Sequence, residues 1–179
     1  MTEQILYRLW VISGGIFLLI SGLFFLKVNA ENLKRFEAVP RNRYFGLVSG
    51  WFGLIWCIPH AQAVAPQFLL PFMWPIALAA PVAAFFCLDY MTARAFGGLL
   101  IIFSYEALHR SFNLDLPLAG IIAVVSWLLG GCGIWISGIP YHFRDAIRLA
   151  AEKKNYKRLF AFSLLASGLL FIVSGVALI

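Results

Sequence analysis

Nearly all the positive charge of this chain lies in three short gaps between long apolar runs. The gaps 27–43, 89–94 and 139–158 hold five, one and six of the 14 Lys and Arg residues, and Arg8 and Arg110 are the remaining two. Short basic loops are retained on the cytoplasmic side of a membrane. The alternation therefore predicts a chain that crosses a bilayer repeatedly and keeps these three gaps on one side.

The composition excludes a water-soluble domain. Apolar residues make up 62% of the chain, charged residues only 12%, and the mean hydropathy is +0.87. Soluble domains have about 25% charged residues. The net charge of +6 does not indicate nucleic-acid binding, because the basic residues flank membrane-length segments, where anionic lipid headgroups are the nearer partner. We therefore expect membrane lipids as partners and no nucleic acid.

Six segments approach the length of about 20 apolar residues that a helix needs to cross a bilayer. They are 6–26, 44–62, 68–88, 93–112, 117–138 and 159–179. The predicted fold class is an all-α integral membrane protein with a single membrane domain over 1–179. With the basic gaps inside, both termini lie outside, and a bacterial plasma membrane is the expected location. Residues 89–92 must turn the chain, because one helix over 68–112 would far exceed membrane thickness.

The gap 139–158 carries its own helical pattern. Pro140 suits a first helical position, and Phe143, Ile147 and Ala150 recur at helical spacing among basic residues. This pattern predicts a short basic amphipathic helix in the headgroup region. Two interpretations remain open for the basic connections: they are ordinary loops held at the membrane surface, or they form a docking platform for a cytoplasmic partner.

Small residues recur at helical spacing in two of the predicted helices. Because lipid is as apolar as a leucine side chain, close backbone approach must supply much of the energy of helix association. The expected helix-packing residues are Gly46, Gly50 and Gly53 in 44–62, and Ser126, Gly130, Gly133 and Ser137 in 117–138. Their spacing leaves open whether the partner helix belongs to this chain or to another subunit.

Ionisable residues at membrane depth are the default place to look for function. His60 is expected near the outer end of the second predicted helix, and Glu106, His109 and Arg110 near the outer end of the fourth. One carboxylate and two imidazoles suit a divalent metal, and two histidines from different helices suit a haem iron. The other interpretations are a polar lining of a transport pathway, and interfacial polarity in which Glu106 pairs with Arg110 at i+4.

Catalytic signatures are missing from the sequence: it has no glycine-rich phosphate loop, zinc-protease motif or nucleophile elbow. Three functions remain open. The favoured hypothesis is a non-catalytic subunit or assembly partner of a larger membrane complex, with other membrane subunits or self-association as the partners. The alternatives are a small-solute or ion permease or channel, and an intramembrane enzyme that depends on a metal or haem.

Overall fold

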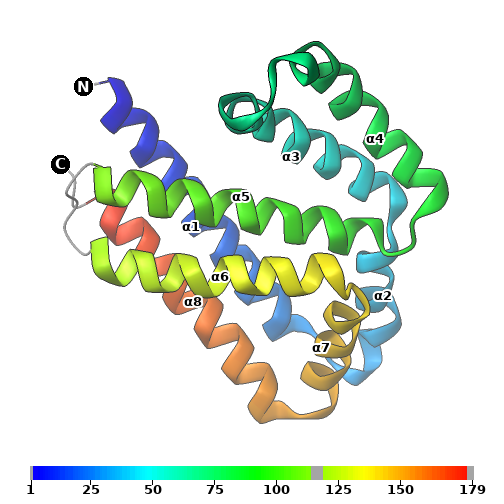
Figure 1. Ribbon diagram of the computed structural model, residues 1–179. Coiled ribbons are helices and arrows are strands. Elements are labelled where there is room, and N and C mark those ends of the chain that lie inside the picture. The colour runs from blue at the N-terminus through cyan, green and yellow to red at the C-terminus, as the bar shows by residue number, and fades with distance from the viewer. Residues whose placement is uncertain (1, 114–118, 177–179) are drawn as a thin grey trace.

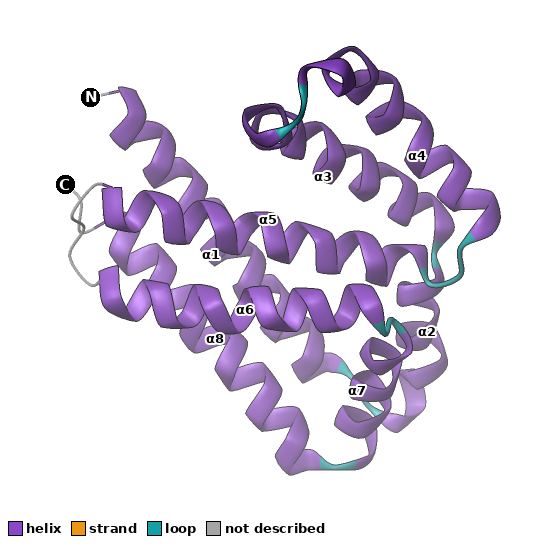
Figure 2. Cartoon of the chain, in the orientation of Figure 1, coloured by secondary structure: helices purple, strands orange, loops and turns teal. Residues whose placement is uncertain are grey.

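The computed structural model describes residues 2–113 and 119–176, and within these ranges it consists of helices joined by short connections, without strands (Figures 1 and 2). The long helices are α1 (Thr2–Lys27), α3 (Arg43–Val64), α4 (Met73–Cys87), α5 (Met91–Asn113), α6 (Ala119–Gly138) and α8 (Lys154–Val176). The shorter elements are η1 (Ala30–Asn32), α2 (Leu33–Ala38), η2 (Val39–Arg41), η3 (Gln67–Phe72) and α7 (Tyr141–Glu152).

Within the described ranges, six helical stretches are long and apolar enough to cross a membrane, one for each predicted segment. The largest shift is in the last, which begins at Lys154, whereas the sequence pattern suggested residue 159. The predicted start at 117 and the predicted end at 179 lie outside the described residues. Helical geometry thus continues into the charged flanks, where a hydropathy pattern carries no signal.

Prolines divide the third stretch into two parts. Pro71 lies in the 3₁₀ helix η3, and α4 takes over at Met73. Pro81 lies inside α4, and because proline has no N–H, the carbonyl four residues earlier loses its helical partner. In the same turn, the Trp51 indole nitrogen of α3 donates a hydrogen bond to the Leu78 carbonyl at 2.9 Å. The neighbouring helix therefore supplies a donor where the proline weakens the backbone ladder.

The amphipathic helix of the last basic gap is α7, with 12 residues, and it is shorter than the gap because α8 already includes Lys154. Its Ile147 and Ala150 are buried in a cluster with Phe25 of α1 and Val28, the residue that follows the last residue of α1. The basic residues of the gap lie outside this cluster. This amphipathic division fixes α7 across the ends of α1 and α8.

The long helices pack mainly as pairs: α1 lies along α8, α5 lies between α3 and α6, and α3 also packs on α4 (Figure 1). The crossing of α1 and α8 depends on two glycines. A Cβ on Gly15 would lie 2.7 Å from the Gly168 carbonyl oxygen, and a Cβ on Gly168 would lie 2.7 Å from the Gly15 carbonyl oxygen. A larger residue at either position would force the two backbones apart.

The small-residue row of α6 packs against α5 of the same chain. A Cβ on Gly133 would lie 2.7 Å from the Gly97 carbonyl oxygen, and one on Gly130 would lie 3.2 Å from the Ser104 Cβ. The carbonyl of Ser137 accepts a hydrogen bond from Arg94 at 2.9 Å, and Ser126 is fully buried. The sequence left open whether the partner helix of this face belongs to this chain or to another subunit. The partner is α5 of the same chain.

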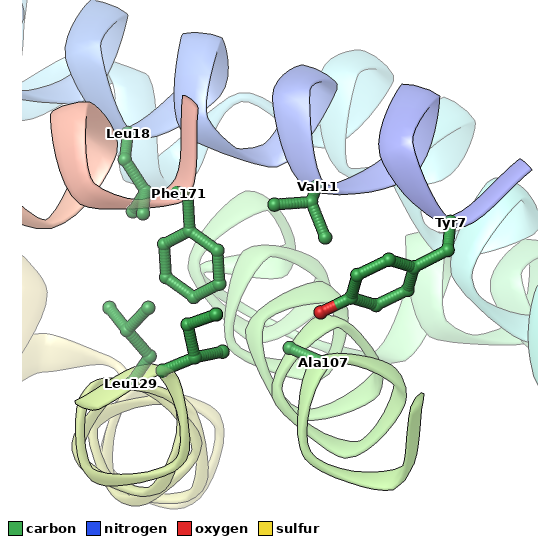
Figure 3. Close-up of a cluster of buried hydrophobic side chains, with 7 residues drawn as sticks. Tyr7, Val11, Leu18, Ala107, Leu129 and Phe171 are labelled. Carbon is green, nitrogen blue, oxygen red and sulfur yellow. The ribbon is translucent and has the colours of Figure 1, made fainter. Parts of the chain in front are cut away.

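A buried apolar cluster joins the two helix pairs (Figure 3). Its members are Tyr7, Val11, Leu18, Ala107, Ile122, Leu129 and Phe171, from α1, α5, α6 and α8. The Trp10 ring stacks on Phe103 of α5 with 4.3 Å between ring centroids, and its edge meets Trp56 of α3 at 5.6 Å. Trp10 thus connects α1 to the α3–α5 unit.

The three basic connections meet at one end of the molecule, which we call the basic end and define by η1, α2, η2, the turn at Tyr90, and α7. Tyr90 adopts the left-handed conformation, with φ 56°. Its hydroxyl accepts hydrogen bonds from Arg41 at 2.8 Å and from Arg144 at 3.1 Å. Glu37 of α2 forms an ion pair with Arg148 of α7. The chain ends of α1 and α8 lie at the opposite, terminal end (Figure 1).

Candidate functional site

Glu106 is a buried carboxylate near the terminal end of α5. Its side chain is only 7% exposed, although a charged group normally remains in water. His60 Nε2 of α3 lies 2.7 Å from one carboxylate oxygen, and Arg110 Nε lies 2.6 Å from the other. Each oxygen of Glu106 therefore has a nitrogen partner, which is the condition for keeping a carboxylate away from solvent.

The contact between His60 and Glu106 follows from the register of two parallel helices. Gly46 of α3 packs on the backbone of Thr92 in α5, and Gly53 packs on Leu99, where a glycine Cβ would lie 3.3 Å from the leucine side chain. His60 and Glu106 stand one further heptad along each helix. Because a seven-residue step returns nearly to the same face of a helix, these pairs form one continuous seam.

Gly50, the third predicted packing residue of this row, lies away from the seam. A Cβ on Gly50 would have Pro81 of α4 at 3.6 Å as its nearest neighbour, an ordinary van der Waals distance. The position four residues from Gly46 is rotated by about 40° around the helix. Gly50 therefore faces α4 and leaves room that a small side chain would fill.

The four polar residues of the predicted outer cluster all lie in this region, but they are not equivalent. His60, Glu106 and Arg110 form the bonded group. His109 stacks on Tyr105 with 5.7 Å between ring centroids, and the edge of the His60 ring meets the same tyrosine at 5.2 Å. Tyr105, which was not among the predicted site residues, thus contacts both imidazoles. The available signal was its position four residues before His109, because residues at this spacing are neighbours on the surface of a helix.

The arrangement does not form a metal centre from the described residues. No three His, Cys, Asp or Glu side chains approach one another closely enough there to hold an ion. Glu106 uses both oxygens on nitrogen donors, and His60 directs Nε2 at that carboxylate. A divalent metal bound by His60, Glu106 and His109 therefore has no geometric support in this part of the chain, and ligation of a haem by the two histidines stays a prediction.

Several buried side-chain polar atoms lie between the helices. In the described part of the chain, the Tyr7 hydroxyl, Trp10 Nε1 and the Ser126 hydroxyl are buried without a hydrogen-bond partner in the protein. The Tyr7 hydroxyl points into the space between α1 and α5, toward Ala107 (Figure 3). Buried polar atoms of this kind are normally satisfied by internal water. Tyr7 and Trp10 were not among the predicted site residues, because aromatic residues near a helix end are typical interfacial anchors.

The chemistry available to this group is proton binding and charge pairing. A carboxylate between an imidazole and a guanidinium can exchange a proton with the imidazole, while the guanidinium keeps its charge. The side chains of His60 and Arg110 are 32% and 39% exposed, so both reach the surface at the terminal end.

Comparison of the chain with protein-family models, with curated proteins and with solved structures gives no match.

Proposed function

We propose that the chain is embedded in a bacterial plasma membrane, with its basic end in the cytoplasm, as a non-catalytic subunit or assembly partner of a larger membrane complex. The clustering of α2, the Tyr90 turn and α7 at one end supports this orientation, because the positive charge then lies on the retained side. Both termini would lie outside.

The observation that carries the proposal is a glycine row on the outward face of α6. Gly120, Gly131 and Gly138 have no described atom within 4 Å of where a Cβ would stand. Trp127 and Trp135, on either side of Gly131, are 72% and 59% exposed. Most other described glycines stand where two helices touch, as at Gly97 and Gly133, and Gly98 of α5 is an exception. A glycine flanked by tryptophans gives a second helix a notch to enter.

The two faces of α6 allow a matched experiment. Gly131→Leu places a bulky side chain in the outward notch, and Gly133→Leu places the same side chain against α5. We expect Gly131→Leu to lose co-purifying subunits or self-association in mild detergent while it keeps the wild-type melting temperature. Gly133→Leu should instead lower the melting temperature. Mass spectrometry of the purified particle measures the first effect.

A wild-type particle with the mass of one chain and no bound subunit would contradict the proposal. Equal assembly of wild type and Gly131→Leu would contradict the use of this face. Ile121→Ala is the further control, because Ile121 is 50% exposed and stands beside the glycine row on the outer surface of α6.

The buried carboxylate favours a second candidate, a proton or cation permease. Glu106 together with the unsatisfied atoms of Tyr7, Trp10 and Ser126 would line a hydrated path in the terminal half of the bundle. The test is flux into liposomes that contain the purified protein, with a pH-sensitive dye inside. Under this hypothesis Glu106→Gln reduces proton flux by tenfold or more, about 1.4 kcal/mol of barrier. Wild-type flux no greater than that of empty liposomes would exclude it.

A further inference from the structure

A hollow of about 740 Å³ opens at the basic end, where α1 ends and α2 begins. Its lining is of two kinds. Lys27 and Arg35 supply positive charge, and Leu26 and Phe36 supply apolar surface. Lys27 is the last residue of α1, so the hollow lies at the level where the apolar helix gives way to polar connections.

The hollow is held in shape by a network of amide groups. The side chain of Asn32 accepts a hydrogen bond from the Asn29 backbone at 2.7 Å and donates one to the Lys27 carbonyl at 2.8 Å. Lys157 of α8 donates to the Asn29 side chain at 2.8 Å and to the Val28 carbonyl at 3.1 Å. The connection after α1 is therefore fixed to both α1 and α8, and a ligand would meet a preformed wall.

The two cations of the hollow are available for a ligand. Lys27 and Arg35 are exposed, and no carboxylate among the described residues lies within ion-pair distance of either. The adjacent hollow of about 430 Å³ is different, because its Glu37 is already paired with Arg148 and its Arg41 is bonded to Tyr90. The smaller hollow also holds one cation without a described ion-pair partner, Lys34, but it lies beside the Glu37 carboxylate, whereas the larger hollow presents two such cations and no carboxylate.

We propose that this hollow binds the phosphate of one anionic phospholipid. Lys27 and Arg35 contact the phosphate oxygens, and Phe36 lies under the glycerol. The side chains of Leu23 and Leu26 are 50% and 36% exposed on α1, and they continue the apolar wall toward the middle of the helix. An acyl chain would pack along these leucines, whereas a free phosphate ion has no apolar part that could contact them. Cations next to a membrane-length helix are a common binding site for anionic headgroups.

This inference rests on the membrane insertion proposed above, which is checked separately by recovery of the protein in the membrane fraction. The full chain is purified in mild detergent and titrated with short-chain phosphatidylglycerol, phosphatidylcholine and inorganic phosphate, with the melting temperature as the readout. The test variant is Lys27→Gln with Arg35→Gln. The matched control is Lys154→Gln with Arg158→Gln, which removes the same charge from exposed residues at the start of α8 that line neither hollow.

We expect phosphatidylglycerol to bind wild type and the control with affinities within about twofold of each other, and the test variant about tenfold more weakly, since each cation near a headgroup strengthens attraction. Lys27→Arg with Arg35→Lys should retain binding. An equal loss in both double variants would show diffuse surface charge and overturn the site. Equal binding of phosphatidylcholine, or binding of inorganic phosphate as tight as that of the lipid, would overturn the lipid assignment.

Discussion

Single residues decide where the helices of this chain approach one another. Gly97 and Gly98 are neighbours in α5, yet their surroundings differ completely. A Cβ on Gly97 would lie 2.6 Å from the Gly133 carbonyl oxygen, whereas one on Gly98 would meet no described atom within 4 Å. The cost of a larger side chain therefore depends on which side of the helix it is placed.

Gly97→Leu is expected to lower the free energy of unfolding by about 3 kcal/mol or more, because overpacking a contact between two backbones forces both to move. Gly98→Leu is expected to be neutral or to stabilise the helix by up to about 1 kcal/mol, because leucine has the higher helix propensity. Thermal melting of the two variants in the same detergent compares them. Equal melting temperatures would contradict the α5–α6 contact.

At the scale of helices, short surface elements are held by ion pairs that respond to pH. The hydrogen bond from Arg148 lowers the pKa of Glu37 below its ordinary value, and nearby Arg144 and Arg41 act in the same direction. A carboxyl whose pKa is lowered by folding adds stability at pH values above its unfolded pKa, and the contribution is lost as the pH falls through the folded value. The contact of α2 with α7 should therefore weaken in acid.

Glu37→Gln tests this contact. The variant should melt below wild type at pH 7, where the carboxylate is charged, and the difference should shrink as the pH falls through the lowered pKa of Glu37, because wild type then becomes neutral at this position as well. The difference should be small at any pH, because the Arg148 side chain is 46% exposed and solvent screens the pair. A difference that stays constant with pH would show that the side-chain shape, not its charge, holds the contact.

For the molecule as a whole, the gathering of three basic connections at one end predicts a single orientation. A reporter fused at the C-terminus is expected to be active only if it functions outside the cytoplasm, and a reporter inserted between Glu152 and Lys154 only if it functions inside. Cysteine labelling with a membrane-impermeant reagent gives an independent reading. Activity of a cytoplasmic reporter at the C-terminus would contradict the orientation or the number of spans.

The candidate site was only partly accessible from the sequence. The pairing of Glu106 with Arg110 follows from their i+4 spacing within one helix. The contact with His60 required the parallel register of α3 and α5, and the spacing of glycines in α3 indicated a packed face without naming its partner. The contact of His109 with Tyr105 follows from their i+4 spacing within α5, whereas the contact of Tyr105 with His60 again depended on how α5 is placed against α3.

The sequence by itself determined the six apolar helices and the division of charge among their connections, because both depend on solvation of each segment alone. Only the tertiary structure decided that the small-residue row of α6 faces α5, that Gly15 crosses Gly168, and that Glu106 is buried between His60 and Arg110. In an apolar chain nearly every face of a helix satisfies hydropathy equally well. The choice among faces is therefore made by close packing and by the few polar groups that must find partners, and both are properties of helices brought together.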